Sequence, residues 1–444
     1  MRQRFLKAAF VAFIVGIGSV SADVVVESFD VISSDPQENL FATIGQPTVA
    51  GLPSGIGVTE EWPVTINMVR LQSLPGTIVL NLPNQVPDPL NRIRSQVRGT
   101  DGFLWTGGGE GCSALLSAIP GAFRATISCL SGTYAVETTP SGPRLARYSY
   151  GPPPAGSEYD VARPPSAGAS NSPASPLSSP DTTLLVDQEI DVMILYTANV
   201  RQALQADNIN VQQYMQDTMD ATQLAMDRST TPGQPVIAEL NLVHAQEISR
   251  SEAGFFYSDD MTYLINDPFP MALRNAWAAD IVMYIRETSP QSNLCGLASS
   301  PRYLGSPPPG PAFAPFAMGV TKRECSFSGY PFQHEFGHIF GANHEPQVNT
   351  NTTPLQPWAF AHWANANNPE DSARTLVSTK HQDCHFECPQ VLNYSNAAIT
   401  LTKPWTFHTG LANQRENARI IGQYAPATAQ YRVGLDIIFA NGFE

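Results

Sequence analysis

The segment from His334 to His344 constrains this chain more than any other, because it spaces three histidines four and then six residues apart. Residues four apart on a helix project from the same face, so His334 and His338 can bind one cation. Gly341 is suited to end that helix, since glycine takes the left-handed conformation at a C-terminus without strain. A sharp turn there would bring His344 back to the same cation. The segment therefore predicts a helix, a turn and a metal site with three histidine ligands.

The chemistry of the predicted site follows from its ligands. Three histidines leave one position of a tetrahedral zinc ion open, which is the arrangement of a catalytic site rather than a structural one. Zinc lowers the pKa of a bound water and polarises a carbonyl group. Glu335 lies beside the first ligand and can reach that water without ligating the metal. We therefore predict one catalytic Zn²⁺ on His334, His338 and His344, with Glu335 as the general base.

The pattern His-Glu-x-x-His-x-x-Gly-x-x-His is the signature of the metzincin zinc metalloproteases. The chain resembles their reprolysin-like (adamalysin-type) branch, particularly its exported bacterial members. The resemblance implies an α/β domain with a twisted, mostly parallel five-stranded sheet over the zinc helix. It also implies a smaller, irregular subdomain, closed by a terminal helix at 414–431, and hydrolysis of peptide bonds in extracellular proteins. Further matches that support it lie at 191–196, 279–282, 293–298, 388–389 and 394–396.

Two positions depart from the family pattern. Metzincins place a methionine in a tight turn beneath the zinc, whereas the equivalent segment here, 374–378, has Val377 at that position. Because that methionine packs under the ligands without binding the metal, valine can keep an apolar floor at the cost of some volume. Glu345 follows the third histidine, where aspartate is commoner in this branch. Val377 leaves open an alternative, a catalytically impaired binding module, while the intact Glu335 favours an active endopeptidase.

The N-terminus predicts export. A basic stretch, 1–7, precedes an uncharged run, 8–20, which ends at the small residues Ser21 and Ala22. This order is typical of a cleavable signal peptide, residues 1–22, and the run is too short to span a bilayer comfortably. An uncleaved anchor is the alternative. We expect a protein that is secreted to the extracellular space, with a periplasm as a compartment in transit, and without stable membrane insertion.

The net charge of −14 excludes one class of partner, because an acidic chain has no electrostatic attraction to nucleic acid or to an anionic membrane. The expected partners are protein or peptide substrates, and the expected state is a monomer.

Composition divides the chain at a segment rich in Pro, Ser, Gly and Ala. Residues 151–182 cannot form a core, so they are expected to be an extended, cleavable linker. Before them, 23–150 alternates short apolar and polar runs between turns, which predicts a β-rich domain. After them, 183–432 is the expected metzincin domain. The tail, 433–444, is either a sorting tag or the end of the fold.

The role of the β-rich domain rests on its position before the linker and on the resemblance to metzincin precursors. Both favour a pro-domain that inhibits or chaperones the enzyme, so the chain is expected to be a zymogen. An accessory or binding domain that stays attached is the alternative.

Strand and helix signals that alternate after the linker predict an α/β fold with a mostly parallel sheet. Strands are expected at 190–196, 235–243 and 279–285, with a short edge strand at 316–321. Between the first two, apolar residues at helical spacing predict a helix over 211–228, whose methionines pack in the core.

Six cysteines in an exported protein favour disulfides. Pairing neighbours in the sequence gives Cys112–Cys129, Cys295–Cys325 and Cys384–Cys388. Two alternatives stay open: Cys112 or Cys129 as a latency thiol on the zinc, and a second metal site. The residues of that second site would be His381, Cys384, His385 and Cys388. His362 and His408 are expected to be ordinary packed or surface histidines.

Overall fold

A computed structural model describes most of the chain between residues 40 and 432. The described ranges are 40–43, 47–49, 56–83, 85, 87–139, 141–150, 161–162, 189–289, 294–301, 312–325, 330–346, 354–365, 372–379 and 388–432. The predicted signal peptide, most of the predicted linker and the C-terminal tail lie outside these ranges. Among the described residues, no helix is both long enough and apolar enough to cross a membrane.

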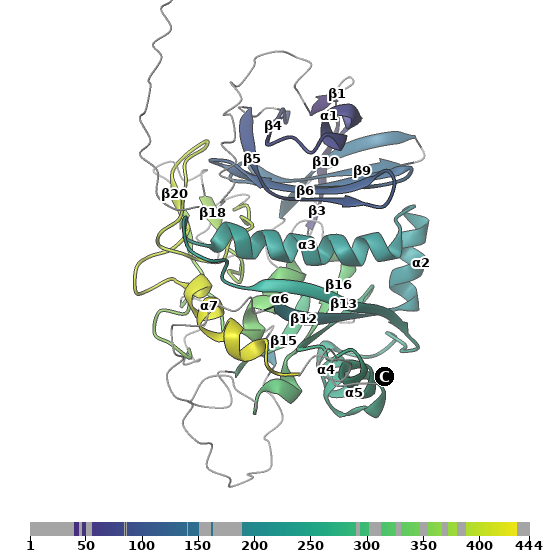
Figure 1. The fold of residues 1–444 in the computed structure, drawn as a ribbon, viewed down its shortest axis with the longest axis vertical. Helices are drawn as coiled ribbons and strands as arrows, with labels where there is room; N and C mark the ends of the chain where they lie inside the picture. The colour runs from purple at the N-terminus through teal and green to yellow at the C-terminus, as the bar shows by residue number, and fades with distance from the viewer. Residues whose placement is uncertain are drawn as a thin grey trace, which may run out of the picture. The chain divides into compact units, whose positions relative to one another are not determined.

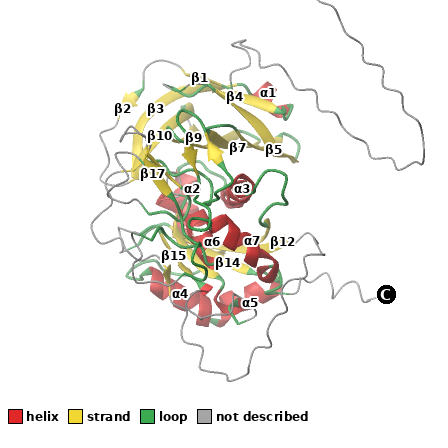
Figure 2. Ribbon diagram, turned by 90° about the vertical axis from the view of Figure 1, so that its left-hand side faces the viewer, coloured by secondary structure: helices red, strands yellow, loops and turns green. Residues whose placement is uncertain are grey.

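The N-terminal residues form one antiparallel sheet, here called the β-domain (residues 40–150, Figure 2). Its ten strands follow the order β1-β3-β10-β9-β8-β7-β6-β5-β4, with β2 paired to β3. Most neighbours in this sheet are also neighbours in sequence, so short turns suffice to connect them. The strands are β1 (Phe41–Thr43), β2 (Thr48–Val49), β3 (Ile56–Ile66), β4 (Thr77–Leu80), β5 (Asp88–Arg98), β6 (Gly102–Gly108), β7 (Cys112–Ile119), β8 (Ala122–Cys129), β9 (Gly132–Thr139) and β10 (Gly142–Tyr150), with helix α1 (Met68–Gln72) between β3 and β4.

The β-domain has a hydrophobic core of its own, which includes Trp62, Trp105 and Tyr134. Buried and partly exposed residues alternate along β8, as expected when one face of a strand points into a core. A disulfide joins Cys112 on β7 to Cys129 on β8, where the two residues face each other across the strands.

The second sheet has the order β11-β15-β16-β14-β12-β13, and all of its strands except β11 belong to the C-terminal domain (residues 189–432). The pairs formed by β12, β13, β14 and β16 are parallel, whereas β15 runs antiparallel to β16. The sheet is therefore mixed, and its strands are β11 (Val161–Ala162), β12 (Glu189–Thr197), β13 (Glu239–Ile248), β14 (Ile281–Arg286), β15 (Gly296–Ser299) and β16 (Met318–Lys322).

Two details of this sheet differ from the prediction. The strand predicted as an edge at 316–321 is β16, which lies inside the sheet between β14 and β15. The sheet also has a sixth strand, because β11, from within the predicted linker, pairs in parallel with β15. The predicted edge was wrong because β15 is only four residues long and gives little periodic signal.

Helices cover both faces of this sheet, with α3 on one side and α4 and α5 on the other (Figure 1). Strand β12 shows why: Ile190, Val192 and Ile194 belong to the core cluster on the α3 side, whereas Met193 and Leu195 belong to the other. A strand buried on both faces reads as a continuous apolar run. The helices are α2 (Ala198–Ala206), α3 (Val211–Ser229), α4 (Tyr257–Asn266), α5 (Pro268–Ala276), α6 (Pro331–Ile339) and α7 (Asn417–Thr428).

Helix α3 matches the helix predicted at 211–228. The side chain of Asn210 caps its N-terminus by accepting a hydrogen bond from the backbone N–H of Gln213 at 3.0 Å. Its methionines are buried in the core, as the sequence indicated. The residues after α6 form two short hairpins, β17 (Trp363–Asn365) with β18 (Ser372–Arg374) and β19 (Thr400–Leu401) with β20 (Phe407–His408).

Candidate metal centre

Helix α6 carries the first two histidines of the predicted site. Pro331 occupies its first turn, where a missing backbone N–H costs nothing. The helix ends just before Gly341, which has a φ of 89°, a conformation that glycine adopts without strain. The N–H of Ala342 donates to the carbonyl of Gly337 at 3.1 Å, which tightens the exit. This glycine turn lets the chain reverse within three residues and reach His344.

The three histidines converge on one point. The Nε2 atoms of His334 and His344 are 3.1 Å apart, and those of His338 and His344 are also 3.1 Å apart. All three side chains are buried, and one nitrogen from each lies within 4.8 Å of the others. Two nitrogens 3.1 Å apart, each about 2.05 Å from one ion, subtend roughly 100° at it, which is close to tetrahedral. The arrangement therefore fits a zinc ion.

The protonation state of His338 follows from its hydrogen-bond partner. The Nδ1 atom of His338 lies 2.8 Å from the carbonyl oxygen of Ala342. A carbonyl oxygen only accepts, so Nδ1 carries the proton and donates, which leaves the lone pair on Nε2 toward the other histidines. Such a contact fixes the ring orientation of a metal-binding histidine.

Glu335 lies beside the histidines and is 2 % exposed. Strand β15 packs directly against it: a Cβ on Gly296 would lie 2.5 Å from both Cγ and Oε1 of Glu335. Only glycine lets the backbone of this strand approach so closely. No sequence signal predicts this contact, because nothing marks Gly296 as the neighbour of a residue 39 positions later.

The floor beneath α6 contains Val377, as the comparison of segment 374–378 with the family pattern suggested. A Cβ on Gly337, between the two helical histidines, would lie 2.8 Å from Val377 Cγ2 and 2.7 Å from the ring of Tyr394. Val377 is fully buried at a φ of 67°, a region that costs a β-branched residue about 1–3 kcal/mol. The surrounding structure therefore holds this turn in place.

Hydrogen bonds hold the turn and the helix together. Arg374 donates through Nη1 to the carbonyl of Ser378 at 2.5 Å, and the N–H of Leu376 donates to the carbonyl of Asn393 at 2.8 Å. Tyr394 donates its hydroxyl to the carbonyl of Gln333 at 2.7 Å. Burial raises the pKa of Tyr394, so the ring stays neutral and keeps this hydrogen bond.

Glu345 links the third histidine to the same turn. Its carboxylate is fully buried and accepts hydrogen bonds from the N–H and the hydroxyl of Thr379, at 3.2 and 2.7 Å. Glutamate is longer than the aspartate that is commoner at this position in the branch, and these hydrogen bonds hold its carboxylate inside the fold. The sequence singled out Glu345 and, within the family match at 394–396, Tyr394, but not Thr379 or the contact of Tyr394 with helix α6, which depend on the tertiary structure.

The remaining predicted cysteines and histidines have other surroundings. Cys295 and Cys325 form a disulfide, and a thiolate from Cys112 or Cys129 is ruled out by their own disulfide. Cys388 is also disulfide-bonded, but its predicted partner Cys384 lies outside the described residues. His381 and His385 of the alternative metal site lie outside them as well, and Cys388, being disulfide-bonded, cannot supply a thiolate to that site.

His362 is buried and stacks on Phe407 with ring centroids 5.8 Å apart, whereas His408 is exposed. Burial, followed by the charges of Arg415 and His408, lowers the pKa of His362 from 6.5 to about 4. A lowered histidine pKa contributes stability that is fully present above pH 6.5 and is lost as the pH falls through 4. The shift corresponds to at most about 3 kcal/mol.

We expect the free energy of unfolding of a His362→Gln variant to depend less on pH than that of the parent. The measurement is urea unfolding at pH 7 and pH 4.5, with His244→Gln, on β13 against Trp277, as the control. The interpretation is wrong if His362→Gln loses as much stability between these pH values as the parent and the control.

Residues 186–394, which include every residue of the site, match a family model described as Metallo-peptidase family M12, of the reprolysin type. Together with the geometry above, this match supports a reprolysin-like metzincin metalloprotease domain within residues 186–394.

Two curated relatives carry the name peptidyl-Asp metalloendopeptidase. The protein from Stenotrophomonas maltophilia (strain R551-3) is 28% identical over 244 residues, which cover 53% of this chain and 53% of that one. The protein from Xanthomonas campestris pv. campestris is 26% identical over 197 residues, which cover 44% and 42%. The chain thus matches about half the length of these relatives. Among solved structures, metalloproteinase-II from Bacteroides fragilis aligns with a TM-score of 0.38 and 12% identity, over 72% of this chain and 88% of that one.

Proposed function

We propose that this chain is a secreted zinc-dependent endopeptidase that is made as an inactive precursor. The observation that supports this most strongly is the convergence of three buried imidazole nitrogens beside the carboxylate of Glu335. A site with three histidine ligands and one open position is the form that catalytic zinc takes. Zinc bound there would supply an acidified water and a Lewis acid for the scissile carbonyl.

The chain's own residues would handle the proton. Glu335 takes it from the attacking water and delivers it to the amine of the leaving peptide. His338 donates from Nδ1 to the carbonyl of Ala342, so its Nε2 lone pair would face the metal. Val377 and Tyr394 pack against helix α6 at Gly337, between His334 and His338, and would keep the helix in position. These roles are proposals that rest on the positions described above.

The expected substrate is an extended peptide. Strand β15 lies against Glu335 at Gly296, and its outer side is where a further strand can add to the sheet. Peptides bind such edges through main-chain hydrogen bonds, with side-chain pockets giving specificity. From the name shared by the relatives, we propose cleavage at aspartyl residues of proteins.

The position of β11 supports a precursor form. Val161 pairs with Ala298 and Ala162 with Ser299, so part of the linker occupies the outer side of β15. A substrate strand cannot pair with the same residues while β11 is there. Cutting the linker would let β11 leave and would open this edge, which is the proposed activation step.

Removal of the metal tests the proposal. We expect a chelator to abolish hydrolysis of an unfolded protein by the linker-cut chain, and stoichiometric zinc to restore it. Zinc content is measured in parallel by mass spectrometry of the metal. Hydrolysis that persists in the metal-free, folded protein would refute the proposed chemistry. A zinc-loaded, folded chain that cleaves nothing would favour the binding-module alternative.

A further inference from the structure

A row of arginines on the β-domain meets a row of aspartates on α3. Arg94 binds Asp227 through two hydrogen bonds at 2.6 and 2.7 Å, and Arg124 binds Asp217 at 3.1 Å. Arg98 pairs with Asp220 and lies 3.6 Å from Asp217. The side chains of Asp217 and Asp227 are only 8 % and 3 % exposed. The β-domain buries these carboxylates, and its arginines balance their negative charge.

Apolar and neutral polar contacts join the same two surfaces. Leu104 on β6 and Leu115 on β7 belong to the core cluster that α3 forms within the C-terminal domain. Gln213 donates to the hydroxyl of Ser117 at 3.1 Å. The guanidinium of Arg228 donates to the carbonyl of Gly109 at 3.1 Å. Helix α3 is thus shared between the two domains as a common core element.

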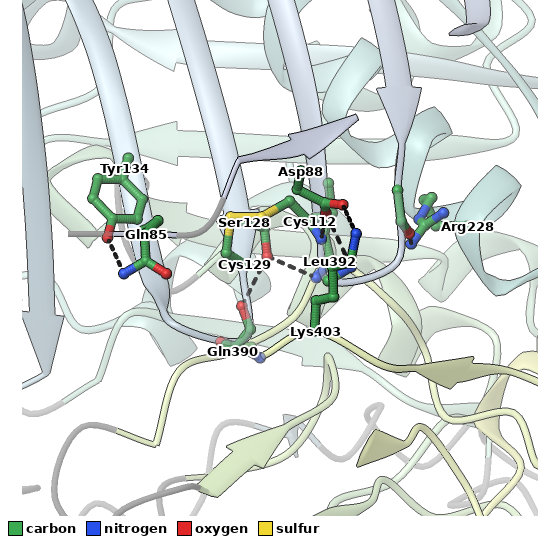
Figure 3. The surroundings of a disulfide bond; sticks show 12 residues. Gln85, Asp88, Cys112, Ser128, Cys129, Tyr134, Arg228, Gln390, Leu392 and Lys403 are labelled. Atoms are coloured by element: carbon green, nitrogen blue, oxygen red, sulfur yellow. Dashed lines mark hydrogen bonds and ion pairs between the residues drawn. A yellow bond between two sulfur atoms is a disulfide. The ribbon is translucent and has the colours of Figure 1, made fainter. Parts of the chain in front are cut away.

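The open end of the β7–β8 hairpin, next to the Cys112–Cys129 disulfide, makes a second contact (Figure 3). The hydroxyl of Ser128 donates to the carbonyl of Gln390 at 3.1 Å and accepts from the N–H of Leu392 at 3.1 Å. Leu130 packs in a small apolar cluster with Val391. The segment bound here, 390–394, leads to Tyr394 and also accepts the hydrogen bond from Leu376. The β-domain therefore supports the floor of the metal centre.

Lys403 adds a charged contact at this second site. Its ammonium lies 3.1 Å from the carboxylate of Glu110 and 3.8 Å from that of Asp88, and the N–H of Thr402 donates to the carbonyl of Glu110 at 2.6 Å. Asp88 in turn accepts from the backbone N–H groups of Gly111 and Cys112, at 3.0 Å each. Contacts on two sides of the C-terminal domain hold the β-domain in one orientation.

We infer that the β-domain is a permanent partner of the C-terminal domain and stays bound after the linker is cut. Separation would leave the α3 carboxylates without their arginines and would expose the leucines that complete the core. Separation would exchange these charge-assisted hydrogen bonds for bonds to water, and the apolar area that the leucines bury would be lost. The mature protein is then a two-chain complex in which β11 can leave the β15 edge while the β-domain remains. The inference rests on these contacts and holds whether or not the protein cleaves peptides.

The test uses the full chain with a recognition sequence for a site-specific protease inserted between residues 166 and 178. A Glu335→Gln background prevents self-cleavage, so the result is independent of the proposed activity. After complete cutting, we expect both fragments to co-elute in size-exclusion chromatography at micromolar concentration. Separation of two folded fragments under these conditions would overturn the inference.

Charge reversal tests the docking contacts themselves. We expect Arg98→Glu to weaken association of the cut fragments by at least ~30-fold, because Asp217 and Asp220 then face a like charge. Arg144→Glu is the matched control, since Arg144 pairs with Glu61 inside the β-domain. Its fragments should co-elute like the parent.

A second variant separates docking from misfolding. Combining Arg98→Glu with Asp220→Arg restores an opposite-charge pair, and we expect it to recover part of the lost association. Equal association constants for Arg98→Glu and Arg144→Glu, or failure of the double variant to recover any association, would contradict the assigned docking face.

Discussion

Replacing Glu335 with glutamine is expected to slow hydrolysis of an unfolded protein by about 10²–10⁴-fold, the usual contribution of a general base. Glutamine has nearly the same shape but cannot take a proton from water. Because Glu335 is buried beside the histidines without being one of the three converging ligands, zinc should remain bound at one ion per chain. The measurement combines initial rates with the zinc content of the same sample.

Glu247→Gln is the matched control for this experiment. Glu247 lies on β13, at the opposite end of the sheet from β15, where it pairs with Arg201 at 2.6 Å. Its replacement should leave the rate unchanged. If Glu335→Gln binds zinc and retains the parental rate, the general base is a different group and the assignment of Glu335 is wrong.

Replacing Gly296 with alanine is expected to lower kcat by about 10²-fold, the cost of displacing a catalytic group by roughly 1 Å. The new Cβ would lie 2.5 Å from Cγ and Oε1 of Glu335, so the carboxylate or the strand must move. The three atoms nearest to the new Cβ all belong to Glu335 and none to a histidine. The zinc content should therefore stay near one ion per chain. Initial rates at saturating substrate measure the effect.

Gly422→Ala, in helix α7, serves as the control, because its Cβ would meet Ile237 at 3.6 Å, an ordinary van der Waals contact. This variant should keep the parental kcat. A normal kcat for Gly296→Ala would show that β15 does not position Glu335. Loss of zinc from Gly296→Ala would instead show that the strand supports the ligands.

The convergence of the three histidines could be predicted from sequence because the spacing that produces it is local. His334, His338 and Gly341 lie within one helix and its exit, where spacing alone sets which side chains share a face. The family pattern added Val377, although no local signal reveals that this valine adopts a positive φ. Local rules also predicted α3, whose apolar residues keep helical spacing for five turns.

The parts that were missed depend on long-range pairing. Strand β13 begins at Glu239 rather than at 235, because it lies at an edge where every residue but the last is partly exposed. Such a strand shows no clear alternation. The docking of Arg98 on Asp220 joins residues 122 positions apart, and any exposed acid on a helix gives the same sequence signal. Strand β11 is two residues long and carries no periodicity.

The most direct test of the central claim is to identify, by mass spectrometry, the new chain ends that the linker-cut protein produces in a mixture of unfolded proteins. We predict cuts at aspartyl residues that disappear with a chelator and in the Glu335→Gln variant. A folded, zinc-loaded protein that produces no new chain ends across a diverse mixture would contradict the assignment of this chain as an endopeptidase.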